Sequence, residues 1–374
     1  MQPSNRKEVN AIRDENGRML TRKEEVIQRF AEYIEELYDD NRAPSPELDQ
    51  EEIQKAKSMN PIGETEVRTI IGELKTGKAN GVDEIPAEML KCVGEAGIAF
   101  ITKIINKIYI TGEIPQDFKN SIFIPIPKDK KAENCTQFRT ISLITHTAKI
   151  LLQVIKKRIT PIIERKLSEN QLGFRKGRGT REGIFQVRQL GERLIQKNRK
   201  LYMAFIDYSK AFDRVQHQKL MEVMKRTGIP ELERRLIANL YWGQTAVVKI
   251  GSEISESITV KKGVRQGCIL SPVLFNLYTD YMIDEAFEDL EGVNVNGENF
   301  TNIRYADDTV LVAESESKLQ LLVQSLNEKC REYGMSLNEN KTKVMVLDGS
   351  GINENINKNV RKNTGTSRRI KLLG

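Results

Sequence analysis

Two adjacent carboxylates, Asp307 and Asp308, lie between two short runs in which apolar residues recur at every second position. The run Asn302–Tyr305 precedes the pair and the run Thr309–Ala313 follows it. Only a tight turn fits between the runs, which predicts a β-hairpin with the two acids at its tip. Neighbouring carboxylates repel each other unless a cation neutralises them, and hard divalent cations such as Mg²⁺ take oxygen ligands. An ordinary Asp-Asp turn is the alternative, because Asp is a common turn former.

A third carboxylate, Asp207, ends the apolar run Leu201–Ile206, which predicts a buried strand. An acid at the end of a buried strand is costly unless it is paired or binds a metal ion. A stabilising acid at the N-terminus of the following helical segment is the alternative. Asp307 lies 100 residues further along the chain, so only the fold can bring the two acids together.

Size and composition exclude several classes of protein. The chain has 374 residues, enough for a sizeable core and two or three subdomains. The sequence has no run of about 18 apolar residues, which argues against a transmembrane helix, and its first residues lack the apolar core of a signal peptide. Four separated cysteines and two histidines argue against a structural zinc site or a disulfide scaffold. We therefore expect an intracellular protein, in the nucleus or the cytoplasm.

Positive charge is concentrated in residues 151–200. This segment holds 14 Lys and Arg against 4 Glu, a net charge of +10, which exceeds the +7 of the whole chain. Such a segment favours a phosphate-rich partner, with a solvated basic face as the alternative. It contains the loop Gln171–Thr180, where glycine allows close backbone approach and arginine offers two parallel donors to a phosphate.

The remaining pattern predicts a mixture of helices and strands. Apolar residues at helical spacing predict helices at Glu24–Leu37, Glu64–Leu74, Ala87–Ile110, Ala148–Leu167, Arg181–Gln196, Val273–Phe287 and Lys318–Tyr333, and a turn with a helix at Ser209–Met224. Besides the strand and hairpin above, we expect strands at Ser121–Pro127, Phe138–Leu143 and Val344–Leu347. Pro161 should kink or break its helix, and the prolines that end Ser121–Pro127 predict an edge strand.

Six short motifs occur in a fixed order along the chain. They are Lys78–Pro86, Phe138–Leu143, Gln171–Arg175, Phe205–Asp213, Arg265–Pro272 and Tyr305–Asp308. With them the chain resembles the reverse transcriptase of non-LTR (LINE-type) retrotransposons, from about Gly77 to the C-terminus and more loosely back to residue 10. Enzymes of mobile introns and telomerase share the palm, but the motifs before residue 200 are more similar to those of LINE elements.

The resemblance implies an α+β fold, a right-hand polymerase with fingers and palm subdomains. An antiparallel palm sheet would carry the acidic hairpin, with helices packed on it. The expected ranges are a helical N-terminal extension and linker at 1–60, fingers with a basic template-binding segment at 61–200, the palm at 201–347, and a mobile segment with a truncated primer-grip strand at 348–374. The family's endonuclease would precede this chain and its thumb would follow, so we expect neither here.

The activity that the resemblance implies is RNA-directed DNA polymerisation, a nucleotidyl transfer from dNTPs to a DNA primer on an RNA template. Asp207, Asp307 and Asp308 would hold two Mg²⁺ ions, or Mn²⁺, about 3.5–4 Å apart. One ion would lower the pKa of the primer 3′-hydroxyl and the other would bind the triphosphate. The backbone carbonyl of Tyr208 would be a further ligand. Because the sequence has no long apolar run, we expect no membrane partner, and the oligomeric state is left open.

Other positions carry over by motif. Lys128 and Arg139 would reach the incoming triphosphate, with ordinary surface cations as the alternative. The ring of Phe212 would lie under the sugar and exclude a ribose 2′-hydroxyl, unless it is simply a core residue. Gln266 would contact the nucleotide or the template beside it. Lys341 would protonate the leaving pyrophosphate, with a surface lysine as the alternative.

Arg175, Lys176 and Arg178 would follow the template phosphates. The chain departs from the family at Thr140, where a proline is usual, and this change should only loosen the backbone. A second function is the alternative. A truncated, inactive remnant could bind RNA through residues 151–200 without copying it.

Overall fold

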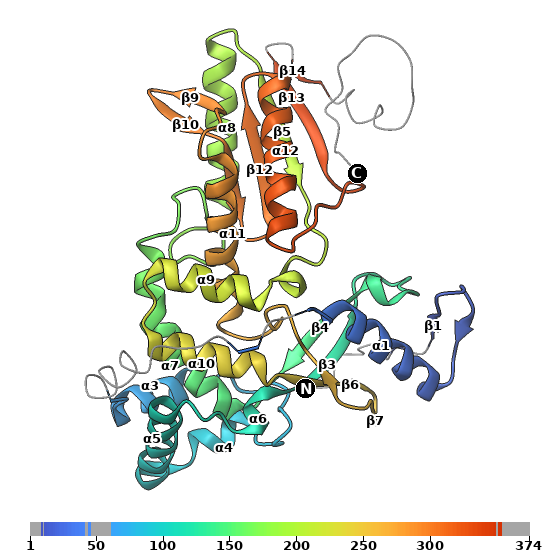
Figure 1. Cartoon of the computed structure of the whole chain (residues 1–374), viewed down its shortest axis with the longest axis vertical. Helices are drawn as coiled ribbons and strands as arrows, with labels where there is room; N and C mark the ends of the chain where they lie inside the picture. The colour runs from blue at the N-terminus through green and yellow to red at the C-terminus, as the bar shows by residue number, and fades with distance from the viewer. Residues whose placement is uncertain (1–8, 10, 42–43, 46–60, 349–350, 354–374) are drawn as a thin grey trace. The chain divides into compact units, whose positions relative to one another are not determined.

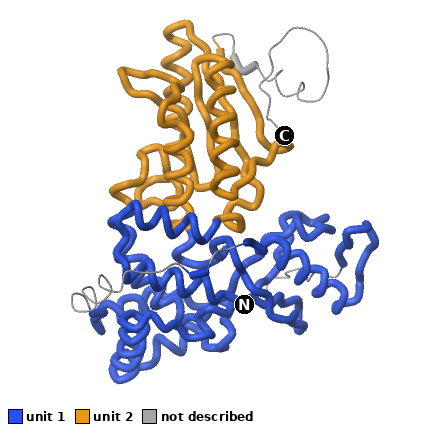
Figure 2. Tube along the Cα trace, viewed as in Figure 1, with its two compact units in different colours: residues 1–163, 216–271 blue, residues 164–215, 272–374 orange. Residues whose placement is uncertain are grey.

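A computed structural model describes residues 9, 11–41, 44–45, 61–348 and 351–353 (Figure 1). The chain divides into two compact units (Figure 2). Unit 1 comprises residues 1–163 and 216–271, and unit 2 comprises residues 164–215 and 272–374. The units cross the predicted ranges, because residues 164–200 belong to unit 2 and residues 216–271 belong to unit 1.

Helices form most of unit 1. They are α1 (Lys23–Tyr38), α3 (Glu64–Glu73), α4 (Ala87–Lys91), α5 (Gly94–Thr111), α6 (Gln116–Lys119), α7 (His146–Glu164), α9 (His217–Thr227) and α10 (Glu231–Trp242), with the 3₁₀ turn η1 (Cys135–Gln137). The strands of the unit are β1 (Ile12–Arg13), β2 (Met19–Leu20), β3 (Asn120–Pro127), β4 (Phe138–Leu143), β6 (Thr245–Ile250), β7 (Glu253–Ile254) and β8 (Ile258–Thr259).

The main sheet of unit 1 has the order β4-β3-β6-β7, and β8 pairs with β6. β3 pairs antiparallel with β4 and parallel with β6, so the predicted edge strand is wrong. The parallel pairing covers only Asn120–Phe123. Pro125 and Pro127 lie beyond it, where β6 requires no backbone donor from them. α1 packs on this sheet, and Phe30 meets Phe138 edge to face with ring centroids 5.1 Å apart.

Two helices of unit 1 differ from the prediction. The expected helix at Ala87–Ile110 is two helices, because Gly94 adopts a φ of +64° after the first one ends. By contrast, α7 continues through Pro161. Ile159 and Ile163 are fully buried on either side of the proline, and their packing holds the helix together across the missing backbone hydrogen bond.

Unit 2 is built around one sheet. Its strands are β5 (Leu201–Ile206), β9 (Val293–Val295), β10 (Glu298–Phe300), β11 (Asn302–Tyr305), β12 (Asp308–Ala313), β13 (Lys343–Asp348) and β14 (Gly351–Asn353). Its helices are α8 (Thr180–Gln196), α11 (Ser271–Phe287) and α12 (Glu316–Glu332), with the 3₁₀ turn η2 (Ala211–Arg214).

The sheet of unit 2 has the order β11-β12-β5-β13-β14, and every pair is antiparallel. Leu201 and Met203 of β5 form a core with Leu190 and Leu194 of α8. Alternate residues of β5 face the other side. α12 packs against β5 and β12 (Figure 1). The predicted hairpin and the antiparallel sheet that carries it are confirmed.

The ends of the chain are described in part. The helix expected at Glu24–Leu37 is present as α1. Residues 46–60, with part of the expected linker, and residues 354–374, with most of the expected C-terminal segment, lie outside the described residues. Within the described ranges, no helix has both the length and the apolar character that crossing a membrane requires.

Candidate active site

Asp207 and Asp308 lie at the ends of neighbouring strands of unit 2. Thr309 of β12 pairs with Ile206 of β5 in an antiparallel register. The next two residues in this register, Asp308 and Asp207, therefore lie opposite each other. Because side chains alternate along a strand, both acids lie on the same side of the sheet. Asp307 lies in the turn that joins β11 to β12. The fold therefore brings Asp207, which lies 100 residues earlier in the chain, to the same end of the sheet as the adjacent pair Asp307 and Asp308.

The backbone of Asp207 is held by the turn before β13. The Asn338 N–H donates to the Asp207 carbonyl (2.7 Å), and the Asp207 N–H donates to the Thr342 Oγ1 (3.4 Å). The same turn places the Lys341 Nζ 3.9 Å from the Asp207 Oδ2. The Lys341 side chain is 66% exposed, so this weak ion pair leaves both groups accessible.

The acids suit a hard cation by type. Asp307 and Asp308 are exposed and Asp207 is half-buried, and carboxylate oxygens are the ligands that Mg²⁺ and Mn²⁺ take. Within the described residues, no three His, Cys, Asp or Glu side chains are grouped closely enough to hold a metal ion. The carboxylate oxygens fit the predicted Mg²⁺ or Mn²⁺ by type. The three acids lie at one end of the sheet, but they do not surround a single point as the ligands of a preformed metal site would.

The turn that carries Asp307 is strained and tightly enclosed. Ala306 is buried and has a φ of +58°, a conformation that costs an L-residue about 1–2 kcal/mol. The Gln171 Oε1 accepts hydrogen bonds from the Ala306 N–H (3.1 Å) and the Gly173 N–H (2.9 Å). A Cβ at Gly173 would lie 2.2 Å from the Ala306 nitrogen. The loop that contains Gln171 is therefore packed directly on the turn.

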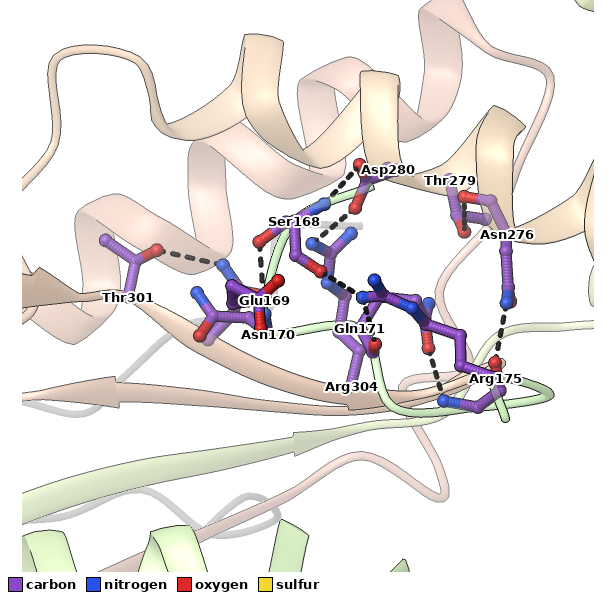
Figure 3. Close-up of polar contacts among 12 residues, drawn as sticks. Ser168, Glu169, Asn170, Gln171, Arg175, Asn276, Thr279, Asp280, Thr301 and Arg304 are labelled. Atoms are coloured by element: carbon purple, nitrogen blue, oxygen red, sulfur yellow. Dashed lines mark hydrogen bonds and ion pairs between the residues drawn. The ribbon is translucent and has the colours of Figure 1, made fainter. Parts of the chain in front are cut away.

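This loop also extends the sheet beyond β11 (Figure 3). The Arg304 N–H donates to the Asn170 carbonyl (2.9 Å), and the Leu172 N–H donates to the Arg304 carbonyl (2.8 Å). The Arg304 guanidinium forms a fully buried ion pair with Asp280 (2.7 Å). The Asp280 Oδ2 in turn accepts a hydrogen bond from the Ser168 N–H (2.9 Å). Arg304 thus binds the loop to the sheet edge through both its backbone and its side chain.

α11 supplies a second attachment for the loop. The Asn276 Nδ2 donates to the Gly173 carbonyl (2.6 Å; Figure 3). Asn276, Asp280 and Arg304 were not predicted as site residues from the sequence. A signal for them was present, because Asn276, Asp280 and Asp284 recur every four residues on a helix with an otherwise apolar interior. Such a row of polar residues predicts a buried partner along the same line.

Arg175 has a different role from the predicted one. Its side chain is buried, and the Nε donates to the Glu164 Oε2 (2.8 Å). The Nη1 donates to the carbonyls of Ser168 (2.8 Å) and Gln171 (3.0 Å; Figure 3). The prediction that Arg175 contacts template phosphates is therefore corrected, because its guanidinium is engaged inside the loop.

The other two cations of the loop remain nearer the surface. Lys176 is exposed. The Arg178 guanidinium pairs with the Glu169 carboxylate and donates to the Glu169 carbonyl (3.0 Å). The Arg178 side chain is 28% exposed. Template contacts for these two residues stay a prediction.

Phe212 packs on the core of unit 2 and is also partly exposed. Its ring stacks on the buried Phe275, with centroids 4.2 Å apart and planes at 11°. It also meets Phe174 edge to face at 6.4 Å, and Phe174 is exposed. Phe212 is therefore supported by the core and half-exposed itself. The neighbouring Tyr208 is buried, and this burial raises the pKa of its phenol.

The cations predicted to bind the triphosphate belong to unit 1. Arg139 is exposed on β4, opposite Ile126 of β3. The Lys128 Nζ donates to the Thr136 carbonyl (2.9 Å) at the end of the same strand pair. The Gln266 carbonyl accepts a hydrogen bond from the Ser142 N–H (2.7 Å), which attaches the Arg265–Pro272 motif to β4.

Unit 1 also contains a pocket of about 830 Å³ beside these strands. Its lining includes Lys78, Ile126, His146, Lys149 and Gly267. Burial lowers the pKa of Lys149 and that of His146, and the positive charge of Lys149 lowers the latter further. A partly buried pocket that carries lysines is suited to an anionic ligand.

Residues 126–374 match the family described as reverse transcriptase (RNA-dependent DNA polymerase). The chain belongs to this family.

Its relatives are non-LTR retrotransposon polymerases. The chain is 28% identical over 347 residues to the probable RNA-directed DNA polymerase from transposon X-element of Drosophila melanogaster, covering 88% of this chain and 37% of the relative. It is 26% identical over 351 residues to the probable RNA-directed DNA polymerase from transposon BS of the same organism, with coverage of 88% and 38%. With the type-1 retrotransposable element R2 polyprotein of Nasonia vitripennis, identity is 25% over 291 residues, with coverage of 78% and 28%. The chain spans 28–38% of the length of these relatives.

The reverse transcriptase fold is also found in a solved structure. The apo telomerase from Candida tropicalis superposes with a TM-score of 0.50 at 14% identity, over 71% of this chain and 54% of that one. At this identity the likeness shows the fold alone. The predicted family and the predicted α+β, right-hand polymerase fold are confirmed.

Proposed function

We propose that this chain carries the catalytic core of an RNA-directed DNA polymerase of retrotransposon origin. The observation that supports this most is the register of β5 and β12. It brings Asp207 and Asp308 together at the same end of the sheet, beside the turn of Asp307. Family membership supports the reaction type, and the names of the relatives support the template class. In these terms, unit 2 holds the core of the palm.

The reaction is a nucleotidyl transfer. The primer 3′-hydroxyl gives up its proton to water, and its oxygen forms a bond to the α-phosphorus of a dNTP. The bond from this phosphorus to the oxygen that it shares with the β-phosphate breaks, and pyrophosphate leaves with that oxygen. Asp207, Asp307 and Asp308, with the Tyr208 carbonyl, would hold two Mg²⁺ or Mn²⁺ ions. These ions, when bound, supply a lowered pKa for the 3′-hydroxyl and charge neutralisation at the triphosphate.

Two residues of unit 2 assist the transfer in this proposal. Lys341, exposed and 3.9 Å from Asp207, donates a proton to the leaving pyrophosphate. The ring of Phe212, stacked on the ring of Phe275, faces the sugar of the nucleotide and excludes a 2′-hydroxyl. A ring fixed by stacking is a better steric barrier than a mobile side chain, since it cannot rotate away.

Residues of unit 1 bind the substrates. Arg139 and Lys128 supply fixed positive charge for the triphosphate of the dNTP. Gln266 contacts the nucleotide or the template base beside it. Lys176 and Arg178 of unit 2 neutralise phosphates of the RNA template, which makes template affinity fall with salt.

Primer extension tests the proposal. The chain is mixed with an RNA template, an annealed DNA primer, dNTPs and Mg²⁺, and the product is followed with time. Asp307→Asn should lower the extension rate about a thousand-fold, because a metal-binding carboxylate accounts for several kcal/mol of transition-state stabilisation. Asp289→Asn is the matched control, since it removes the charge of an exposed acid that follows α11.

Two results would contradict the proposal. One is the absence of Mg²⁺-dependent extension on any RNA template by the unmodified chain. The other is an equal rate for Asp307→Asn and Asp289→Asn. Salt-sensitive RNA binding without synthesis would instead support an RNA-binding remnant that uses residues 151–200.

A further inference from the structure

A buried amide holds the turn that carries Asp307. The Gln171 side chain is fully buried, and its Oε1 accepts from the Ala306 N–H at 3.1 Å. Asp307 is the next residue along the chain. We propose that Gln171 is the positioning residue for Asp307, an inference that rests on the proposed polymerase function of the acids.

The turn requires such a support because of its backbone. Ala306 has a φ of +58°, a region that glycine adopts freely and alanine does not. A non-glycine residue remains in this region only where its surroundings determine the conformation. The hydrogen bond to Gln171 and the close approach of Gly173 are those surroundings.

The supporting loop is itself fixed from several directions. Gln171 accepts from the Gly173 N–H, Asn276 donates to the Gly173 carbonyl, and Arg175 donates to the Gln171 carbonyl. Arg304 pairs with the loop through its backbone and is held by Asp280 through its side chain (Figure 3). We call this set of contacts among Gln171, Gly173, Arg175, Asn276, Asp280 and Arg304 the frame. The Gln171 oxygen belongs to the frame and holds the turn in a fixed position relative to it.

The Gln171 oxygen is the only part of the amide that acts here. Within the described residues, the Gln171 Nε2 has no hydrogen-bond partner. Replacement by methionine keeps the length and volume of the side chain and removes the acceptor. The Gln171→Met variant therefore isolates the contact with the turn.

The consequence falls on the chemical step. The Ala306 N–H belongs to the peptide between Tyr305 and Ala306. If this peptide rotates, the turn shifts and the Asp307 carboxylate moves away from its place beside Asp207 and Asp308. A displacement of about 1 Å near a reacting centre can lower the rate about 100-fold. The cations of unit 1 are unchanged, so we expect kcat to fall about 100-fold with little change in the KM for dNTP.

Hydrogen exchange of the full chain tests the support without any need for activity. In Gln171→Met, amides of residues 303–309 should exchange roughly tenfold faster, the change expected when one hydrogen bond is lost. Amides of β13 should not change. Gln324→Met on α12 is the matched control, since it makes the same replacement at a half-buried position away from the turn.

A glycine at the turn provides the second test. Ala306→Gly in the Gln171→Met background should restore kcat about tenfold, because glycine adopts the left-handed conformation without the strain. In the unmodified chain, Ala306→Gly should change kcat much less. A residue that merely stabilises the fold would not be rescued in this way. If Gln171→Met does not fold, Gln171→Asn, one methylene shorter, should show the same faster exchange and the same rescue.

Unchanged exchange at residues 303–309 overturns the inference, whether or not the chain extends primers. Losses that simply add in the double variant overturn it as well. If the unmodified chain extends no primer, the proposed function fails, and the exchange result still decides whether Gln171 holds the turn.

Discussion

Asp307 lies on a turn that is fixed from three sides, whereas Arg139 extends from β4 with its side chain exposed. The turn is held by Gln171, by the close approach of Gly173 and by the pairing of β11 with β12. Arg139 is positioned through its strand, where it lies opposite Ile126. The two residues belong to different units and are supported to very different degrees.

The difference follows from what each residue is proposed to do. A carboxylate that positions a reacting oxygen requires accurate geometry, and small displacements are costly. A cation that attracts a phosphate acts over several ångströms and tolerates movement. Buried contacts of Gln171 and Arg304 therefore accumulate around the acids, whereas Arg139 stays exposed on β4. Stability and kcat should therefore depend on the buried contacts around the turn of Asp307, while nucleotide affinity should depend on exposed charge.

The largest effect should come from breaking the buried pair in the frame. Arg304→Met leaves Asp280 as an uncompensated buried charge, so the free energy of unfolding should fall by about 3–5 kcal/mol. The double variant Arg304→Met/Asp280→Leu removes both charges and should recover most of this loss. Urea denaturation of the three proteins measures both values. A loss below about 1 kcal/mol in the single variant would show that the frame does not depend on the pair.

A smaller effect should separate two neighbours in the sequence. Arg175→Gln removes an ion pair with Glu164 and two donors to carbonyls, so the free energy of unfolding should fall by about 2 kcal/mol. Lys176→Gln should change it by less than about 0.5 kcal/mol. RNA binding should respond in the opposite way. Lys176→Gln should reduce the slope of log affinity against log salt by about 0.7, and Arg175→Gln should leave the slope unchanged.

Urea denaturation and RNA binding at several salt concentrations distinguish the two residues. An equal loss of salt slope in both variants would restore Arg175 as a phosphate contact. An unchanged stability in Arg175→Gln would show that its contacts inside the loop do not support the frame.

The local parts of the site could be predicted from the sequence. The hairpin follows from alternating runs with room for only a tight turn, and the helices follow from their apolar spacing. Asp207 could be placed at the end of a strand in the same way. Bringing Asp207 beside Asp308 required the family motifs, because no local pattern specifies which strands pair.

Contacts between distant segments account for what the sequence did not predict. Gln171 contacts Ala306 across 135 residues, and the parallel pairing of β3 with β6 joins segments more than 100 residues apart. The packing of residues 164–200 into unit 2 depends on the core that α8 forms with β5. Arg175 is a nearer case, since its partner Glu164 lies only eleven residues earlier. A glycine- and arginine-rich loop is typical of phosphate binding, and its burial could not be seen in composition.

The smallest effect should appear at Arg139, which is exposed on β4. Arg139→Gln should change the free energy of unfolding by less than about 0.5 kcal/mol, because the side chain is exposed. The KM for dNTP should rise about tenfold with kcat nearly unchanged, since one charged contact to the triphosphate is lost. Arg22→Gln, an exposed arginine before α1 in the same unit, is the control. Steady-state primer extension measures both constants. A fall in kcat as large as that expected for Gln171→Met would remove the distinction between the two regions, because Arg139 would then also require accurate positioning.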